Sequence, residues 1–132
     1  MLPKTGIIYS WIYNRELNRD KTAKYVKDHF AKLESDCKKF EKLYKKHILK
    51  ILKLIPKYTK KEWEKEYIPI YIVFRDGYSF HSPLTLKYNK NVRQMFFELI
   101  HELIHNNIEE HGYNAERKID EIAHLILKRL KL

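Results

Sequence analysis

The chain has 132 residues, of which 44% are hydrophobic and 14% aromatic, and it contains only 3 glycines and 4 prolines. This composition excludes a disordered tail and predicts one folded domain, 1–132, that can bury its own core. The single cysteine, Cys37, excludes an internal disulfide and a cysteine-based zinc cluster, and it fits a reducing compartment.

The net charge is +10, from 27 basic and 17 acidic residues. Such a balance is compatible with a nucleic-acid or anionic-membrane partner. A lysine- and glutamate-rich solvated surface, common in proteins from hot environments, also explains it. The basic residues are scattered and form no arginine-rich tract, which favours the solvated surface. No apolar run approaches the ~18 residues of a membrane span, so we expect a soluble, cytoplasmic protein.

The first part of the chain predicts a short element and then a long helix. Residues 6–13, GIIYSWIY, indicate a first strand or a packed apolar arm. From a cap at Asp20 or Thr22 to Pro56, a helix stop, the pattern is helical. Apolar residues recur there at spacings of three and four: Val26, Phe30, Leu33, Cys37, Phe40, Tyr44 and Ile51. So long a helix either bends near Ser35–Asp36 or extends beyond the rest of the domain. Its apolar face could pack on the sheet or on the same helix of a second chain in a homodimer.

The middle of the chain predicts a sheet. The motif T-x-x-E at 59–62 indicates a short capped helix. Residues 67–74, YIPIYIVF, are almost all β-branched or aromatic and predict a buried strand. A second extended stretch follows at 78–89, in which Pro83 indicates an edge position.

The last part of the chain predicts two helices. The first covers 92–108, and Gly112 separates it from the second, which runs from about 114 to 130. The order of elements predicts an α+β domain. Its first part, 1–89, holds a long N-terminal helix packed on a small mixed sheet, and its second part, 90–132, holds the two helices.

The segment HELIH, residues 101–105, has the pattern H-E-x-x-H. On a helix, residues four apart share one face, so His101 and His105 can bind one metal ion. Glu102 lies about 100° further round, from where it can reach a water on the metal and take its proton. The donor types suit Zn²⁺. The alternative is a metal-free helix with two histidines at the edge of an apolar stripe.

Three downstream residues are candidates for the third ligand. His111 has the spacing of H-E-x-x-H-x-x-G-x-x-H, but Ile108 occupies the glycine position and no methionine follows for a Met-turn. Glu116 opens the last helix, and Asp120, one turn on, can accept a hydrogen bond from a ligating histidine. His124 lies one further turn along. We favour Glu116.

HELIH followed by a helix that carries E-x-x-x-D resembles the gluzincin zinc metallopeptidases, to which thermolysin belongs, and the short chain is most similar to the minigluzincins. The resemblance implies a zincin-like fold and hydrolysis of peptide bonds. It implies zinc on His101, His105 and Glu116, with Glu102 as the catalytic base and Asp120 supporting a ligating histidine.

The resemblance also implies an edge strand above the metal that pairs with an extended peptide substrate. The best candidate is the stretch from Ser79 to Lys87, with contacts from Ser79, Phe80, Leu84, Thr85 and Leu86. It further implies a latent, zymogen-like form, blocked here by the last helix or by a neighbouring chain. The oxyanion of the reaction needs a hydrogen-bond donor, for which Tyr113 and His124 are candidates.

Two other functions stay open. The basic charge is compatible with a nucleic-acid-associated protein whose peptidase site acts on bound proteins or is vestigial. The helices are compatible with a structural dimer held together by zinc. Four protein ligands, including His111 or His124, would then leave no place for water.

Overall fold

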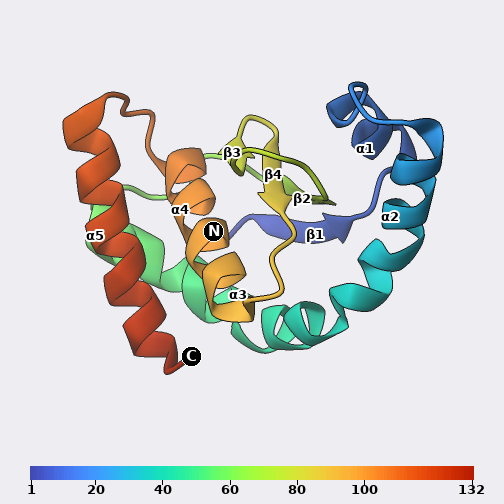
Figure 1. Ribbon diagram of the computed structural model, residues 1–132. Helices are drawn as coiled ribbons and strands as arrows, with labels where there is room; N and C mark the ends of the chain where they lie inside the picture. The colour runs from blue at the N-terminus through green and yellow to red at the C-terminus, as the bar shows by residue number, and fades with distance from the viewer.

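The structure is a computed structural model that describes all residues, 1–132, and it contains five helices and one four-stranded mixed sheet (Figure 1). The prediction of an α+β chain is confirmed. The elements in chain order are β1 (Lys4–Ile8), α1 (Trp11–Leu17), α2 (Ala23–Asp36), α3 (Lys38–Thr59), β2 (Tyr67–Val73), β3 (Phe80–His81), β4 (Leu84–Lys87), α4 (Val92–Asn107) and α5 (Tyr113–Leu130).

The sheet has the strand order β1-β2-β4-β3. β2 pairs in parallel with β1 on one side and with β4 on the other, and β3 pairs antiparallel with β4. The predicted strand 67–74 is confirmed as β2. Its residues Ile68, Ile70 and Ile72 are buried, as expected for alternate positions that face the core.

The predicted strand or arm at 6–13 is only partly right. β1 ends at Ile8, and α1 follows after Ser10, whose hydroxyl accepts a hydrogen bond from the Tyr13 amide. Two buried asparagines explain the change. Asn14 accepts from the Phe74 amide at 3.1 Å, and Asn18 donates to the Phe74 carbonyl at 2.8 Å. Side chains of this segment therefore replace strand hydrogen bonds at the end of β2.

The predicted long helix divides at Cys37 into α2 and α3, which confirms the bend expected near Ser35–Asp36. The expected stop at Pro56 is wrong, because α3 continues to Thr59. Proline has no amide hydrogen to bond the carbonyl of residue 52. The Trp63 indole nitrogen bonds that Leu52 carbonyl instead, at 2.8 Å, so the helix tolerates the proline.

The capped helix predicted from the motif at 59–62 is also wrong. Thr59 ends α3, and Lys60 takes a left-handed conformation with φ 62°. The Thr59 hydroxyl donates to the Asn107 side chain at 2.6 Å, and the Asn107 amide donates to the Lys61 carbonyl at 3.0 Å. Residue 59 therefore ties the end of α3 to the end of α4.

The extended stretch 78–89 forms a hairpin, with Pro83 in its turn. Of the two hairpin strands, only β3 lies at a sheet edge, whereas β4 is an interior strand between β2 and β3. The expectation of one edge strand from 79 to 87 is therefore corrected. Leu84, Thr85 and Leu86 lie in β4 and are buried. Because β4 is paired on both sides, it has no free edge with which a substrate could pair.

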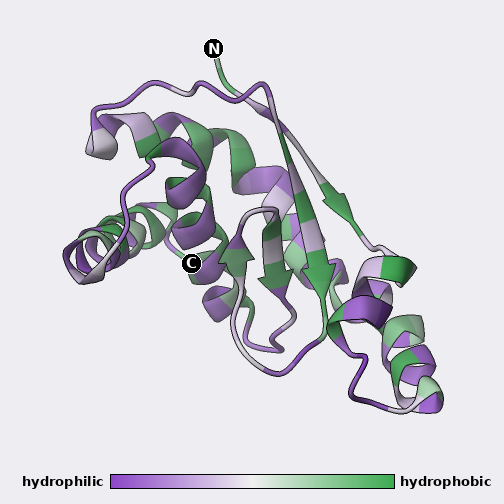
Figure 2. Ribbon diagram, turned by 90° about the horizontal axis from the view of Figure 1, so that it is seen from above, coloured by the Kyte–Doolittle hydropathy of each residue, from purple (hydrophilic) through white to green (hydrophobic).

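Helices α3, α4 and α5 pack together, and α4 also contacts β3 and β4 (Figure 1). Green and purple alternate along these helices in Figure 2, in agreement with their amphipathic sequences. Asn91 caps α4, accepting from the Gln94 amide at 3.1 Å. No helix combines the length and the hydropathy that crossing a lipid bilayer requires.

Candidate metal centre

Two helices bring the candidate ligands together. His101 and His105 lie one turn apart on α4, and Glu116 and Asp120 lie one turn apart at the start of α5. α5 returns alongside α4 after Gly112, whose φ of 100° is a conformation that favours glycine (Figure 1). This tight turn places the first turn of α5 against the last turns of α4.

The side chains of His101, His105 and Glu116 converge. Nε2 of His101 lies 3.0 Å from one carboxylate oxygen of Glu116, and Nε2 of His105 lies 2.8 Å from the other. One donor atom from each of the three residues lies within 4.8 Å of the other two. Both histidines are largely buried, whereas 48% of the Glu116 side chain is exposed. The site is therefore open to solvent on its α5 side.

These contacts need a cation or protons between the groups. Nδ1 of His101 lies 2.8 Å from a carboxylate oxygen of Asp120, which places a proton on Nδ1 and leaves a lone pair on Nε2 in the neutral ring. That lone pair faces the oxygen lone pairs of Glu116. A metal ion bound by two imidazole nitrogens and one carboxylate satisfies all three groups at once, and this donor set fits Zn²⁺.

Burial favours the form of His105 that binds a metal. Its side chain is 3% exposed, and burial lowers its pKa, against a smaller opposing effect of Glu116. A neutral imidazole is the metal-binding state. Nδ1 of His105 is buried and has no hydrogen-bond partner, so the hydrogen bond that His101 donates to Asp120 has no counterpart on His105.

Glu102 lies beside these groups on α4 and is 6% exposed. Burial raises its pKa to about 7, against a smaller lowering effect of His101. A carboxyl group with such a pKa can both accept and return a proton near neutral pH. Glu102 is therefore suited to the proton-transfer role expected from the sequence.

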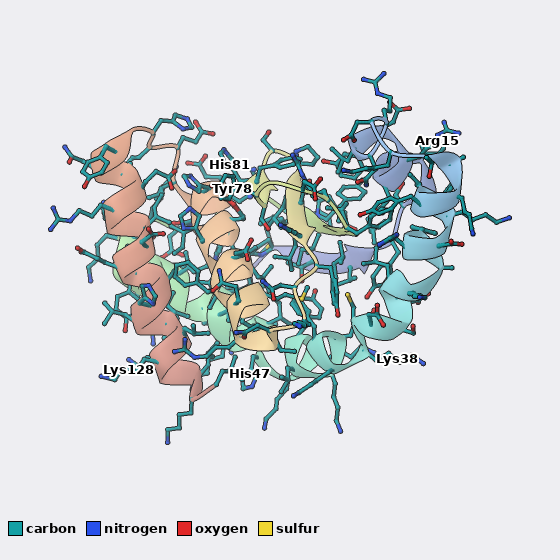
Figure 3. All side chains as sticks on the ribbon, viewed as in Figure 1. Arg15, Lys38, His47, Tyr78, His81 and Lys128 are labelled. Atoms are coloured by element: carbon teal, nitrogen blue, oxygen red, sulfur yellow. The ribbon has the colours of Figure 1, made fainter.

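His81, on β3, was not predicted as a site residue. Its ring stacks on that of His105, with centroids 4.4 Å apart and an interplanar angle of 15°. It also forms a second donor group with Glu102 and His105, again within 4.8 Å. Figure 3 shows His81 next to α4. A signal for it existed, because His81 is the only histidine in the predicted edge strand.

A cleft of about 750 Å³ runs over the site. One wall is formed by residues 77–81, including the edge strand β3, and the other by α4 and the start of α5. Two side chains hold β3 in place. Ser79 donates to Glu98 at 2.7 Å, and Asn106 donates to the His81 carbonyl at 3.1 Å. Of the five predicted substrate-strand residues, Ser79 and Phe80 line this cleft.

The other predicted residues lie outside the cleft lining. His111 is exposed on the return loop, with its ring centroid 6.2 Å from that of His81. Tyr113 is 81% exposed. His124 is exposed on α5 and packs on Phe97, with centroids 4.5 Å apart. The structure thus brings Glu116, and not His111 or His124, onto the two motif histidines.

Comparison of the chain with protein-family models, with curated proteins and with solved structures gave no match. The interpretation of the site therefore depends on its geometry and donor chemistry. These provide three side chains that could hold a metal ion, a buried carboxyl group beside them, and a cleft that gives access to both.

Proposed function

We propose that the chain is a zinc-dependent peptidase of the gluzincin type, similar to the minigluzincins. The observation that carries the proposal is the convergence of His101, His105 and Glu116 within 4.8 Å on the wall of a cleft. Asp120 supports it, because a carboxylate on the outer nitrogen of a ligating histidine fixes the tautomer that binds metal.

Zinc bound there would polarise a substrate carbonyl and lower the pKa of a water molecule. Glu102, buried in the cleft wall, takes the proton of the attacking water and then delivers it to the leaving amine. The outer edge of β3 has no partner strand, so the free backbone groups of this edge can pair with an extended peptide. The chain residues thus orient the substrate and transfer the proton.

Two features favour this function over a structural zinc staple. A staple needs four protein ligands and no access for water. Here His111 and His124 lie outside the cleft lining, and the cleft reaches the metal ligands. No residue after Asp120 lines the cleft, so the C-terminal part of α5 leaves it open.

The test compares Glu102→Gln with wild type and with Glu121→Gln, a control on the exposed side of α5. Each protein is loaded with zinc, its metal content is measured, and its hydrolysis of casein is followed. We expect all three to hold one zinc, and only Glu102→Gln to lose casein hydrolysis, by at least ~100-fold. Undiminished hydrolysis by Glu102→Gln, or no hydrolysis by any zinc-loaded form, would refute the proposal.

A further inference from the structure

The exposed face of α3 is made almost entirely of lysines. Nine residues of this helix are exposed, and the only one that is not lysine is Leu49. The eight lysines are Lys38, Lys39, Lys42, Lys45, Lys46, Lys50, Lys53 and Lys57. At about 100° per residue these nine positions span an arc of only ~140°, so their charges form one continuous basic face.

No carboxylate neutralises this face. The ion pairs of the structure involve none of the eight lysines. The one acidic residue of α3, Glu41, accepts a hydrogen bond from Tyr9 at 2.7 Å. Lys50 instead contacts the Arg129 carbonyl near the end of α5, which brings the exposed Lys128 and Arg129 beside the same face. Ten of the basic residues that look scattered in the sequence are therefore gathered on one surface.

Two exposed leucines interrupt the charge. Leu49 lies within the lysine arc of α3 and is 61% exposed, and Leu125 of α5 is 49% exposed. Leu125 precedes Arg129 by one helical turn, so both point to the same side of α5. An apolar side chain ringed by lysines is suited to a boundary between water and hydrocarbon, where lysine stems also gain contact.

The basic face and the cleft lie on different sides of the molecule. In Figure 3, Tyr78 and His81 mark the cleft at the upper edge, whereas Lys38, His47 and Lys128 lie along the lower edge. A surface that binds the lysines of α3 would therefore leave the cleft open to solution.

We propose that the exposed face of α3, with the adjoining end of α5, docks on the surface of a lipid bilayer that contains anionic phospholipids. The lysines contact the headgroup phosphates, and Leu49 enters the interface. Clusters of four to eight lysines on an amphipathic helix are typical of such contacts. A nucleic acid also binds lysines, but its phosphate backbone offers nothing to Leu49, and the exposed residues of α3 include no arginine, asparagine or glutamine that could read bases.

The test is co-sedimentation with vesicles of phosphatidylcholine, with or without phosphatidylglycerol. It uses the full chain and two variants with the same loss of charge. The variant of the face changes four lysines of α3 to glutamine: Lys42, Lys45, Lys46 and Lys53. The control changes four exposed lysines elsewhere that form no ion pair: Lys24, Lys27, Lys32 and Lys90. Thermal melting checks that both variants fold.

We expect wild type to bind only the anionic vesicles, and added salt to weaken that binding. Each lysine near such a surface contributes up to about fivefold in binding. The affinity of the α3 variant for anionic vesicles should thus fall at least ~10-fold, and that of the control variant less than ~2-fold. Leu49→Gln should remove the binding that persists in high salt. The proposal fails if wild type does not co-sediment with anionic vesicles, or if both variants lose the same amount of binding. It also fails if duplex DNA at equal phosphate concentration displaces the protein from vesicles.

Discussion

Asp120→Ala is expected to weaken zinc binding about 10-fold without removing any ligand atom. Asp120 lies 2.8 Å from Nδ1 of His101, and a carboxylate in this position typically contributes 10- to 100-fold to metal affinity. Because 52% of the Asp120 side chain is exposed, solvent screens its charge, and we expect the lower end of that range. Tenfold corresponds to ~1.4 kcal/mol.

Asp120→Asn should weaken binding by only about threefold. Its amide oxygen can still accept from His101, but a charge-assisted hydrogen bond is about twice as strong as a neutral one. Half of ~1.4 kcal/mol corresponds to that factor. Glu121→Ala serves as the control, because Glu121 is the next residue of α5 and pairs with Arg117 instead. The zinc affinity of each variant is measured by competition with a chromophoric chelator. Equal affinities of Asp120→Ala and Glu121→Ala would refute the assigned role of Asp120.

Three further predictions concern the fold. Asn14→Ala should lower the free energy of unfolding by about 1–3 kcal/mol, because it leaves the buried Phe74 amide without a partner; an unchanged urea midpoint would contradict this. Trp63→Phe should lower the free energy of unfolding by ~1–2 kcal/mol, because it removes the donor to the Leu52 carbonyl. Urea denaturation measures this change, and an unchanged midpoint would contradict it. The pKa of the buried Cys37 thiol is raised by burial to about 12, so Ellman's reagent at pH 8 should label it only after unfolding; rapid labelling of the native protein would be inconsistent with its burial.

Local patterns were enough to predict most helices and the two motif histidines. The apolar spacing in 22–56 and the pattern of 92–108 depend on neighbours within a few residues, and they appear in the structure as α2, α3 and α4. The i, i+4 relation alone places His101 and His105 on one face. The proximity of Glu116 required one more condition, the tight return after Gly112, which a glycine in that position permits.

Features set by distant contacts could not be read from the chain. The continuation of α3 past Pro56 depends on an indole seven residues further on, and α1 depends on asparagines that bond the end of β2. Likewise, His81 reaches His105 only because β3 pairs with β4 and the resulting hairpin is held over α4. The interior position of β4 follows from its pairing with β2, which no local pattern indicates.

The most direct test of the central claim is an anomalous difference map at the zinc edge, measured on zinc-soaked crystals. We predict one strong peak about 2.0–2.2 Å from Nε2 of His101, Nε2 of His105 and a carboxylate oxygen of Glu116. A peak bound by His81, Glu102 and His105, or one that includes His111, would contradict the assignment of the ligands. No peak near ordered His101 and His105 would contradict the metal site itself.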